Sequence, residues 1–183
     1  MTRVRRAAVG QDGAVTTPPL VNLEPLTLAV LEALAVDDLD LASALTGLSI
    51  PDSLLDQAWL WRLRREQLQH TPSDLEWIVR LVTTADGEVV GHAGFHGGPD
   101  EAGLVEIGYS VVVEHRGRGY ARAAIVKLLA WAAAEPAVRT LRASVSPDNA
   151  ASLHLVASHG FVCAGEQWGD VDGIELILER PAR

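Results

Sequence analysis

The chain has 183 residues, 48% of them hydrophobic and 21% charged, which is typical of one globular domain and not of a disordered chain. Its formal net charge of −9 argues against a broad nucleic-acid surface, because such a surface needs clustered cations. No apolar run approaches the ~20 residues of a membrane-spanning helix, and the single cysteine, Cys163, excludes an internal disulfide and a cysteine-rich zinc site, so we expect a cytoplasmic protein.

The first elements follow an irregular start. Residues 1–22 contain glycines and prolines without sustained periodicity, which predicts a flexible leader ahead of a single domain at 23–183. Arginines near the start are not followed by an apolar run, which argues against a secretion signal. The apolar run 26–32 predicts a first strand, and acidic residues early in 36–45 favour a helix.

The middle of the chain changes from a helical to a strand pattern. A second helix is predicted to begin at Pro51 and to end before Pro72, with apolar residues near helical spacing. Residues 77–82, 89–95 and 104–111 then alternate as strands, separated by short Asp-Gly and Gly-Gly-Pro turn signals. Three strands joined by short loops predict an antiparallel meander.

The last third alternates helix and strand. Residues 120–134 have the helical period, and the strand predicted at 140–145 should lie parallel to the previous strand because a helix connects them. A short helix begins after Asn149, and 161–164 and 171–178 are the terminal strands. The order predicts an α/β (α+β) fold, a mixed sheet with helices on both faces.

One loop stands out at the end of the third meander strand. Residues 114–121 read Glu-His-Arg-Gly-Arg-Gly-Tyr-Ala and lie between a strand and the start of a helix. Unpaired backbone N–H groups and the helix dipole make such a place an anion site. The loop therefore predicts a phosphate or pyrophosphate ligand.

The same loop carries a family resemblance. Arg116, Gly119 and Ala121 match the Arg/Gln-x-x-Gly-x-Gly/Ala signature of the GNAT superfamily of acyl-CoA-dependent N-acyltransferases. Residues 105–111 resemble the fourth strand of that family. Six residues alone are a weak signal, and their position between this strand and a helix makes it specific.

Downstream residues resemble one branch of the family. The stretches Asn149–Ser152 and Gly160–Phe161 are similar to the Asn-x-x-Ser and Gly-Phe block of the RimJ/RimL-like branch, which acetylates ribosomal-protein N-termini. The resemblance covers residues 26–180 in element order, and its motifs lie within 106–161. It implies a GNAT-like three-layer α/β/α sandwich with a mixed, mostly antiparallel central sheet.

The resemblance also implies an acetyl-CoA site. Backbone amides of the loop would hold the pyrophosphate, with charge-assisted help from two arginine side chains, and the pantetheine arm would pair with the neighbouring strand. The implied cofactor-binding residues are Val111, Val113, Arg116, Gly117, Arg118, Gly119, Tyr120, Ala121, Asn149 and Ser152. No metal is implied.

Two residues are candidates for the chemistry of acyl transfer. Glu106 resembles the glutamate of the family's fourth strand and would act as the base, through water, although a surface carboxylate is the alternative. Ser152 would donate a hydrogen bond near the sulfur, while Asn149 could be only an N-cap. Many members carry a tyrosine acid where this chain has Val156, so that role shifts to Ser152.

Four aromatic residues are weaker signals. His92 and His96 share one strand face without an evident third metal ligand, so we interpret them as strand histidines, one of them at the acceptor cleft. Trp59 and Trp61 lie on a helix that would border the acceptor, where they either grip a substrate or pack in the core. Cys163 is predicted to be buried and inert.

We therefore predict a single-domain N-acetyltransferase that moves an acetyl group from acetyl-CoA directly to a primary amine. A peptide or protein N-terminus fits the resembled branch, and a small-molecule amine or amino-sugar is the alternative acceptor. A non-catalytic acyl-CoA-binding sensor is the alternative outside enzymes. The expected partners are a CoA thioester and an amine, without nucleic acid or membrane, and a homodimer is left open.

Overall fold

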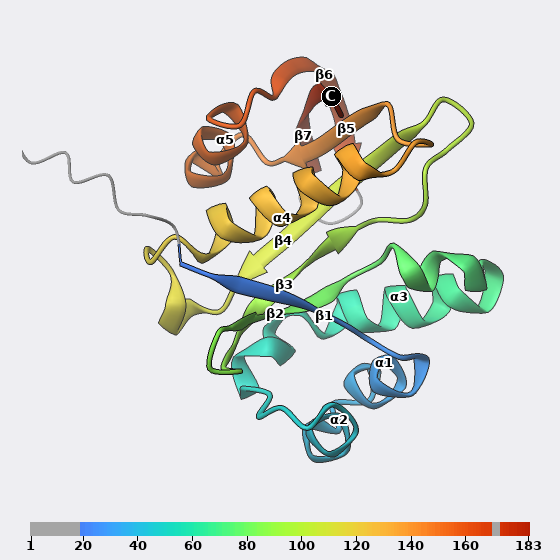
Figure 1. Ribbon diagram of the computed structural model, residues 1–183, viewed down its shortest axis with the longest axis vertical. Helices are drawn as coiled ribbons and strands as arrows, with labels where there is room; N and C mark the ends of the chain where they lie inside the picture. The colour runs from blue at the N-terminus through green and yellow to red at the C-terminus, as the bar shows by residue number, and fades with distance from the viewer. Residues whose placement is uncertain (1–18, 170–172) are drawn as a thin grey trace, which may run out of the picture.

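The computed structural model describes residues 19–169 and 173–183 (Figure 1), so most of the expected leader lies outside the described residues. The strands are β1 Val21–Pro25, β2 Arg80–Thr84, β3 Val89–Phe95, β4 Leu104–Val111, β5 Thr140–Val145, β6 Val162–Gly169 and β7 Gly173–Pro181. The α-helices are α1 Leu28–Ala35, α2 Leu39–Thr46, α3 Ala58–His70, α4 Tyr120–Ala134 and α5 Ala150–Ala157. Three short 3-10 helices are η1 Asp52–Gln57, η2 Pro72–Glu76 and η3 Val113–His115.

The strands form one seven-stranded sheet in the order β1-β2-β3-β4-β5-β7-β6. All neighbours are antiparallel except β4 and β5, which are joined by α4 as a crossover helix requires. The predicted α/β class, meander and parallel pair are therefore confirmed.

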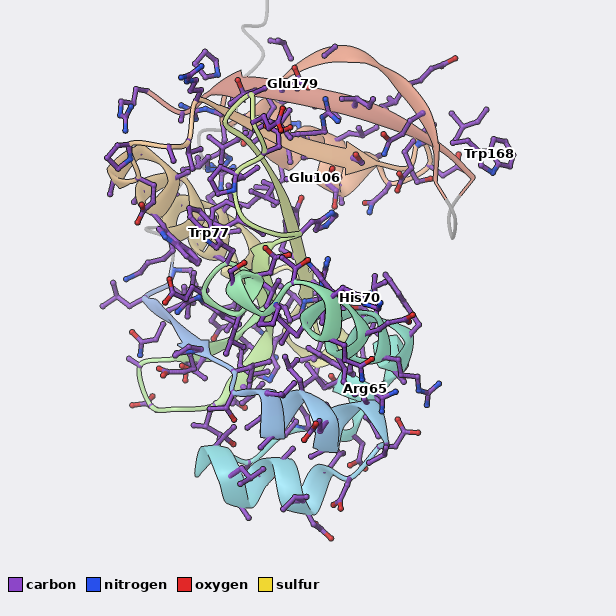
Figure 2. The ribbon with its side chains drawn as sticks, turned by 90° about the vertical axis from the view of Figure 1, so that its right-hand side faces the viewer. Arg65, His70, Trp77, Glu106, Trp168 and Glu179 are labelled. Atoms are coloured by element: carbon purple, nitrogen blue, oxygen red, sulfur yellow. The ribbon has the colours of Figure 1, made fainter. Side chains whose placement is uncertain are left out.

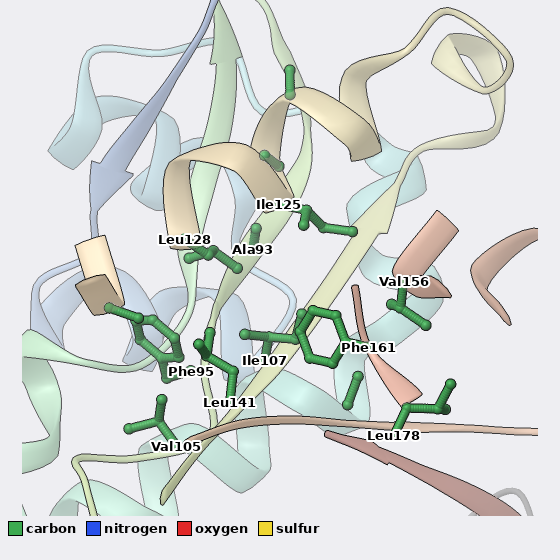
Figure 3. Packing of buried hydrophobic residues seen from close by; sticks show 14 of the residues in the cluster. Ala93, Phe95, Val105, Ile107, Ile125, Leu128, Leu141, Val156, Phe161 and Leu178 are labelled. Carbon is green, nitrogen blue, oxygen red and sulfur yellow. The ribbon is translucent and has the colours of Figure 1, made fainter. Parts of the chain in front are cut away.

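Helices cover both faces of this sheet, each over its own hydrophobic core. On one face, α4 and α5 pack on the strands through residues that include Ile125, Leu128 and Val156 (Figure 3). On the other face, α1, α2 and α3 pack through residues that include Leu31 and Trp61. None of the helices in the described part is long and apolar enough to cross a bilayer.

The prediction of a first strand at 26–32 is wrong. The strand β1 ends at Pro25, and the Thr27 side chain accepts a hydrogen bond from the Val30 amide (3.3 Å) to begin α1. An apolar run of this length fits a strand or a buried helix, and the N-cap threonine decides for the helix. Because β1 begins at Val21, the sheet also includes the last two residues of the expected leader.

The terminal hairpin also differs from expectation. The strand predicted at 161–164 is twice as long, because β6 runs from Val162 to Gly169 as the outermost strand of the sheet. Nearly all of β6 is exposed, and Cys163 is an exposed free thiol rather than a buried one. The first two residues of the strand predicted at 171–178 lie outside the described residues, and the described strand β7 runs from Gly173 to Pro181.

Candidate active site

The site begins where two parallel strands separate. β4 and β5 are paired only from Leu104 with Thr140 to Glu106 with Arg142, and beyond that point β4 pairs with β3 while β5 continues beside β7. A cavity of about 490 Å³ lies in the gap. The residues lining it include Glu106–Tyr109 of β4, Ala143–Val145 of β5, and Asn149 and Ser152.

The loop that follows β4 has free backbone donors. Gly119 has φ +86° and forms the N-cap of α4, and Gly117 also has positive φ (+73°), a conformation that favours glycine. In the first turn of α4, the amide of Ala123 donates a hydrogen bond to the carbonyl of Gly119 (3.0 Å). Among the described residues, the amides from Gly117 to Arg122 donate to no backbone carbonyl. This is the geometry of an anion cradle.

The arginine side chains of the loop differ from each other. The Nε of Arg116 donates to the carbonyl of Val111 (3.0 Å), so this side chain braces the end of β4. Arg118 is exposed and makes no hydrogen bond to another described residue. The Arg116 side chain therefore has a structural role, and the Arg118 side chain is available to a ligand. Val113, which precedes them, is also exposed.

The start of α5 supplies the opposite wall. The side chain of Asn149 accepts a hydrogen bond from the Ser152 amide (3.1 Å), which makes Asn149 an N-cap as the simpler interpretation predicted. Both residues also line the cavity. The cap fixes the first turn of α5 and thereby places the Ser152 hydroxyl at the cavity.

A tyrosine that the sequence interpretation missed lies beside Ser152. Val156 is fully buried in the core, so that position does not face the cavity. Tyr109 of β4 lines the cavity, and its hydroxyl is buried without a hydrogen-bond partner among the described residues. Burial raises the pKa of Tyr109, and the Ser152 hydroxyl lowers it in part, although the two hydroxyls do not meet hydrogen-bond geometry here.

The side chain of Glu106 lies on the face of β4 opposite to that of Tyr109. Its carboxylate is mostly buried, lines the cavity, and lies 3.6 Å from Nδ1 of His96. A Cβ on Gly108 would be 2.9 Å from Nε2 of His96, so the imidazole lies against Gly108 and would have to move if this residue had a side chain. Arg142, which pairs with Glu106 across the two strands, donates its hydrogen bond to Glu179 (2.7 Å). The ionisable partner of the Glu106 carboxylate is therefore His96.

A buried arginine stabilises the chain at His96. Arg64 of α3 donates to the carbonyl of His96 (2.9 Å) and to Gln67 (2.6 Å). Burial lowers the pKa of Arg64, while Asp74 and Glu106 raise it. The pKa of His96 is lowered by burial and by Arg64, against the raising effect of Glu106. His96 is therefore a neutral base at neutral pH.

The other histidine and one tryptophan belong to the interior. His92 is buried against Trp61, with ring centroids 5.3 Å apart, and its ring contacts Gln57. Burial, followed by Arg64, lowers the pKa of His92 to about 4. The described residues contain no group of three or more histidines, cysteines or acidic residues placed to hold a metal.

Aromatic and acidic side chains form the rim of the cavity. Trp59 of α3 and Trp168 of β6 are exposed and line it, and Figure 2 shows Trp168 far out on the β6–β7 hairpin and Glu106 deep between the two parts of the sheet. The amide of Gln167 donates to Ser144 and to Glu175, both at 3.1 Å. These bonds hold the Glu175 carboxylate at the rim.

Comparisons with known proteins agree with this geometry. Residues 21–162 match the family described as "Acetyltransferase (GNAT) domain". An uncharacterized N-acetyltransferase of Bacillus subtilis, YjdG, is 37% identical over 86 residues, which cover 47% of this chain and 50% of that protein. The chain spans about half the length of the curated relatives it matches.

Solved structures share the fold. A chimera of the spermidine N-acetyltransferase SpeG from Vibrio cholerae and hSSAT aligns with a TM-score of 0.63 and 16% identity, over 88% of this chain and 95% of that one. RimJ from Mycobacterium smegmatis, in complex with CoA-disulfide, aligns with a TM-score of 0.63 and 21% identity, over 90% of this chain and 83% of that one. At these identities the likeness concerns the fold alone.

Proposed function

Because the chain belongs to the GNAT acetyltransferase family, we propose that it transfers an acetyl group from acetyl-CoA directly to a primary amine. The observation that carries this proposal is the separation of β4 and β5, which opens a cavity along β4. β4 in turn leads into the loop whose amides from Gly117 to Arg122 donate to no described backbone carbonyl. Such a cavity suits an extended thioester whose charged end lies on the loop.

The residues present fit acetyl-CoA. The free amides from Gly117 to Arg122 would bind the pyrophosphate, and Arg118 is available to it as a charged side chain. Arg116 would support the loop through its bond to Val111. RimJ from Mycobacterium smegmatis, with the same fold, is known with a CoA-disulfide.

One side of the cavity carries groups that can accept a proton, and the other carries a hydroxyl that can donate a hydrogen bond. Glu106 and His96, 3.6 Å apart, form a pair that would take the proton of the attacking amine. Ser152 would donate a hydrogen bond to the departing sulfur. Cys163 lies on exposed β6 and not at the cavity, which supports transfer without an acyl-enzyme, and its free thiol is consistent with a cytoplasmic protein.

The acceptor we propose is a peptide or protein N-terminus, because the motifs around Asn149 resemble the RimJ-like branch. A small cationic amine is the second candidate, and the cavity rim favours it. The carboxylates of Glu106 and Glu175 and the exposed rings of Trp59 and Trp168 would attract a cation by charge and by cation–π contact.

The test is thiol release from acetyl-CoA with a panel of N-terminal peptides, polyamines and amino-sugars. We expect at least one class to give amine-dependent release with an acetylated product seen by mass spectrometry. Tight CoA binding without any acetylated amine would instead favour the sensor alternative.

The loop is tested separately by CoA binding. A valine at Gly119 would have an unfavourable φ and a Cβ 3.1 Å from Pro19, so Gly119→Val should weaken CoA binding at least tenfold in calorimetry. Gly165→Val is the control, because a Cβ there meets nothing within 4 Å. Unchanged CoA affinity in a folded Gly119→Val protein would contradict the site.

A further inference from the structure

We propose that His96, held by Glu106, is the group that removes the proton from the acceptor amine. This inference rests on the proposed function and names the base within the same site. It places the proton on an imidazole nitrogen, whereas the sequence pattern points to the carboxylate of Glu106.

The backbone of His96 is fixed from both sides. Its amide donates to the carbonyl of Glu106 (2.8 Å). Its own carbonyl accepts from Arg64 (2.9 Å) and from Gln67 (2.7 Å). These three bonds fix the backbone of His96, and a fixed backbone limits where its side chain can lie, as a catalytic group requires.

The side chain of His96 is placed by its two neighbours on β4. Nδ1 faces the Glu106 carboxylate at 3.6 Å, and the ring lies over Gly108, whose missing Cβ leaves room for Nε2. The carboxylate favours the tautomer with the proton on Nδ1, which leaves the lone pair of Nε2 free. The imidazole lines the cavity and is about half exposed there.

Burial lowers the pKa of His96 and favours its neutral form, against the raising effect of Glu106. The Glu106 carboxylate of β4 faces the ring, and Arg64 of α3, whose own pKa is lowered by burial against the raising effect of Asp74 of η2, donates to the His96 carbonyl. His92 of β3 stays neutral because its pKa is about 4. A neutral imidazole with a free Nε2 lone pair can take a proton directly from an amine in contact with it.

The proton and electron pairs balance in the proposed step. The amine nitrogen attacks the thioester carbonyl carbon and forms the C–N bond, while its proton passes to Nε2 of His96. The C–S bond breaks, and the sulfur leaves with the electron pair as a thiolate that accepts a hydrogen bond from Ser152. The imidazolium then gives its proton to the thiolate, which yields an amide and a thiol and returns His96 to its neutral form.

The first test uses the free protein and needs no amine. NMR titration of the histidine C2–H signals, with His96→Gln to assign the signal, should show that the pKa of His96 lies below the ordinary value for histidine. In Glu106→Gln the His96 pKa should fall further, because the raising charge is lost. An unchanged His96 titration in Glu106→Gln would overturn the coupling of the pair.

The second test uses the pH profile of kcat/KM with an amine found in the panel. His96→Gln should lower kcat/KM about 100-fold and remove the acid limb, while Glu106→Gln should retain part of the activity with the limb moved to lower pH. The matched controls, His70→Gln and Glu101→Gln, alter exposed residues outside the cavity and should leave the profile unchanged.

The outcomes separate this inference from the proposed function. Absence of thiol release by the unaltered protein with every amine would reject the proposed function. Release with an acid limb that persists in His96→Gln and disappears in Glu106→Gln would reject His96 as the base and assign the proton to Glu106. Normal CoA binding by both variants would show that neither change acts through the cofactor site.

Discussion

At the scale of single residues, the phenol of Tyr109 combines a stability cost with a place at the cavity. Its hydroxyl is buried without a hydrogen-bond partner among the described residues, which costs stability. It lies beside Ser152, at the cavity that Val156 does not reach. A hydrogen bond from Tyr109 to the Ser152 oxygen would direct the serine proton toward the leaving sulfur.

Tyr109→Phe should therefore change stability and turnover in opposite directions. Removing an unpaired buried hydroxyl should leave the melting temperature equal or higher, while the loss of support for Ser152 should lower kcat about five- to tenfold. In a Ser152→Ala background the same change should have no further effect on kcat. Equal losses in both backgrounds would show that Tyr109 acts independently of Ser152.

Some of these residues could be found from the sequence and others could not. Glu106 and Ser152 lie within motifs, and both line the cavity. Side chains alternate between the two faces of a strand, so the sequence pattern places Tyr109 and Glu106 on opposite faces of β4. Both nevertheless line the cavity, because it lies between two strands and is bordered by side chains from both faces of the sheet. His96 comes from a strand end whose pairing with Glu106 depends on tertiary structure.

At the scale of elements, α5 connects folding to the site. It is only eight residues long, and such a short helix depends on its cap and its packing. The cap is Asn149, whose side chain bonds the Ser152 amide, so the same contact that begins the helix positions a residue of the cavity.

Asn149→Ala should destabilise the protein by about 1 kcal/mol in denaturant unfolding and should also reduce turnover. Asp38→Ala is the matched control, because Asp38 caps α2 through the Leu41 amide (2.9 Å) outside the cavity lining. It should lose similar stability and keep full turnover. Full turnover in Asn149→Ala would show that the residue is a cap and nothing more.

The limits of sequence prediction also appear in the elements. The meander, the parallel pair and α4 follow from turn signals and periodicity and are confirmed. The error at 26–32 arises because an apolar run fits either a strand or a buried helix. The length of β6 was missed because an exposed edge strand has no alternating apolar pattern, as residues 162–169 show.

At the scale of the whole molecule, His92 should make folding sensitive to pH. Its pKa is about 4 in the folded protein against about 6.5 when unfolded, so the unfolded chain binds more protons between these values. Stability from the neutral His92 is thus complete above pH 6.5 and decreases as the pH falls toward 4, by about 3 kcal/mol in all.

Chemical denaturation of the unaltered protein and of His92→Gln, followed from pH 7 to pH 4, measures this contribution. The unaltered protein should lose more stability over this range than the variant, whatever their stabilities at pH 7. Parallel pH dependences would show that His92 can accept a proton without cost in the folded state.

The parting of β4 and β5 has a consequence for the order in which substrates load. Tyr109 and Ser152 reach the opening from the side of α4 and α5, whereas His96 and Trp59 reach it from the side of α3. The cavity therefore has walls from both faces of the sheet. For the activity proposed above, a donor and an acceptor that bind from opposite faces would not need to bind in a fixed order.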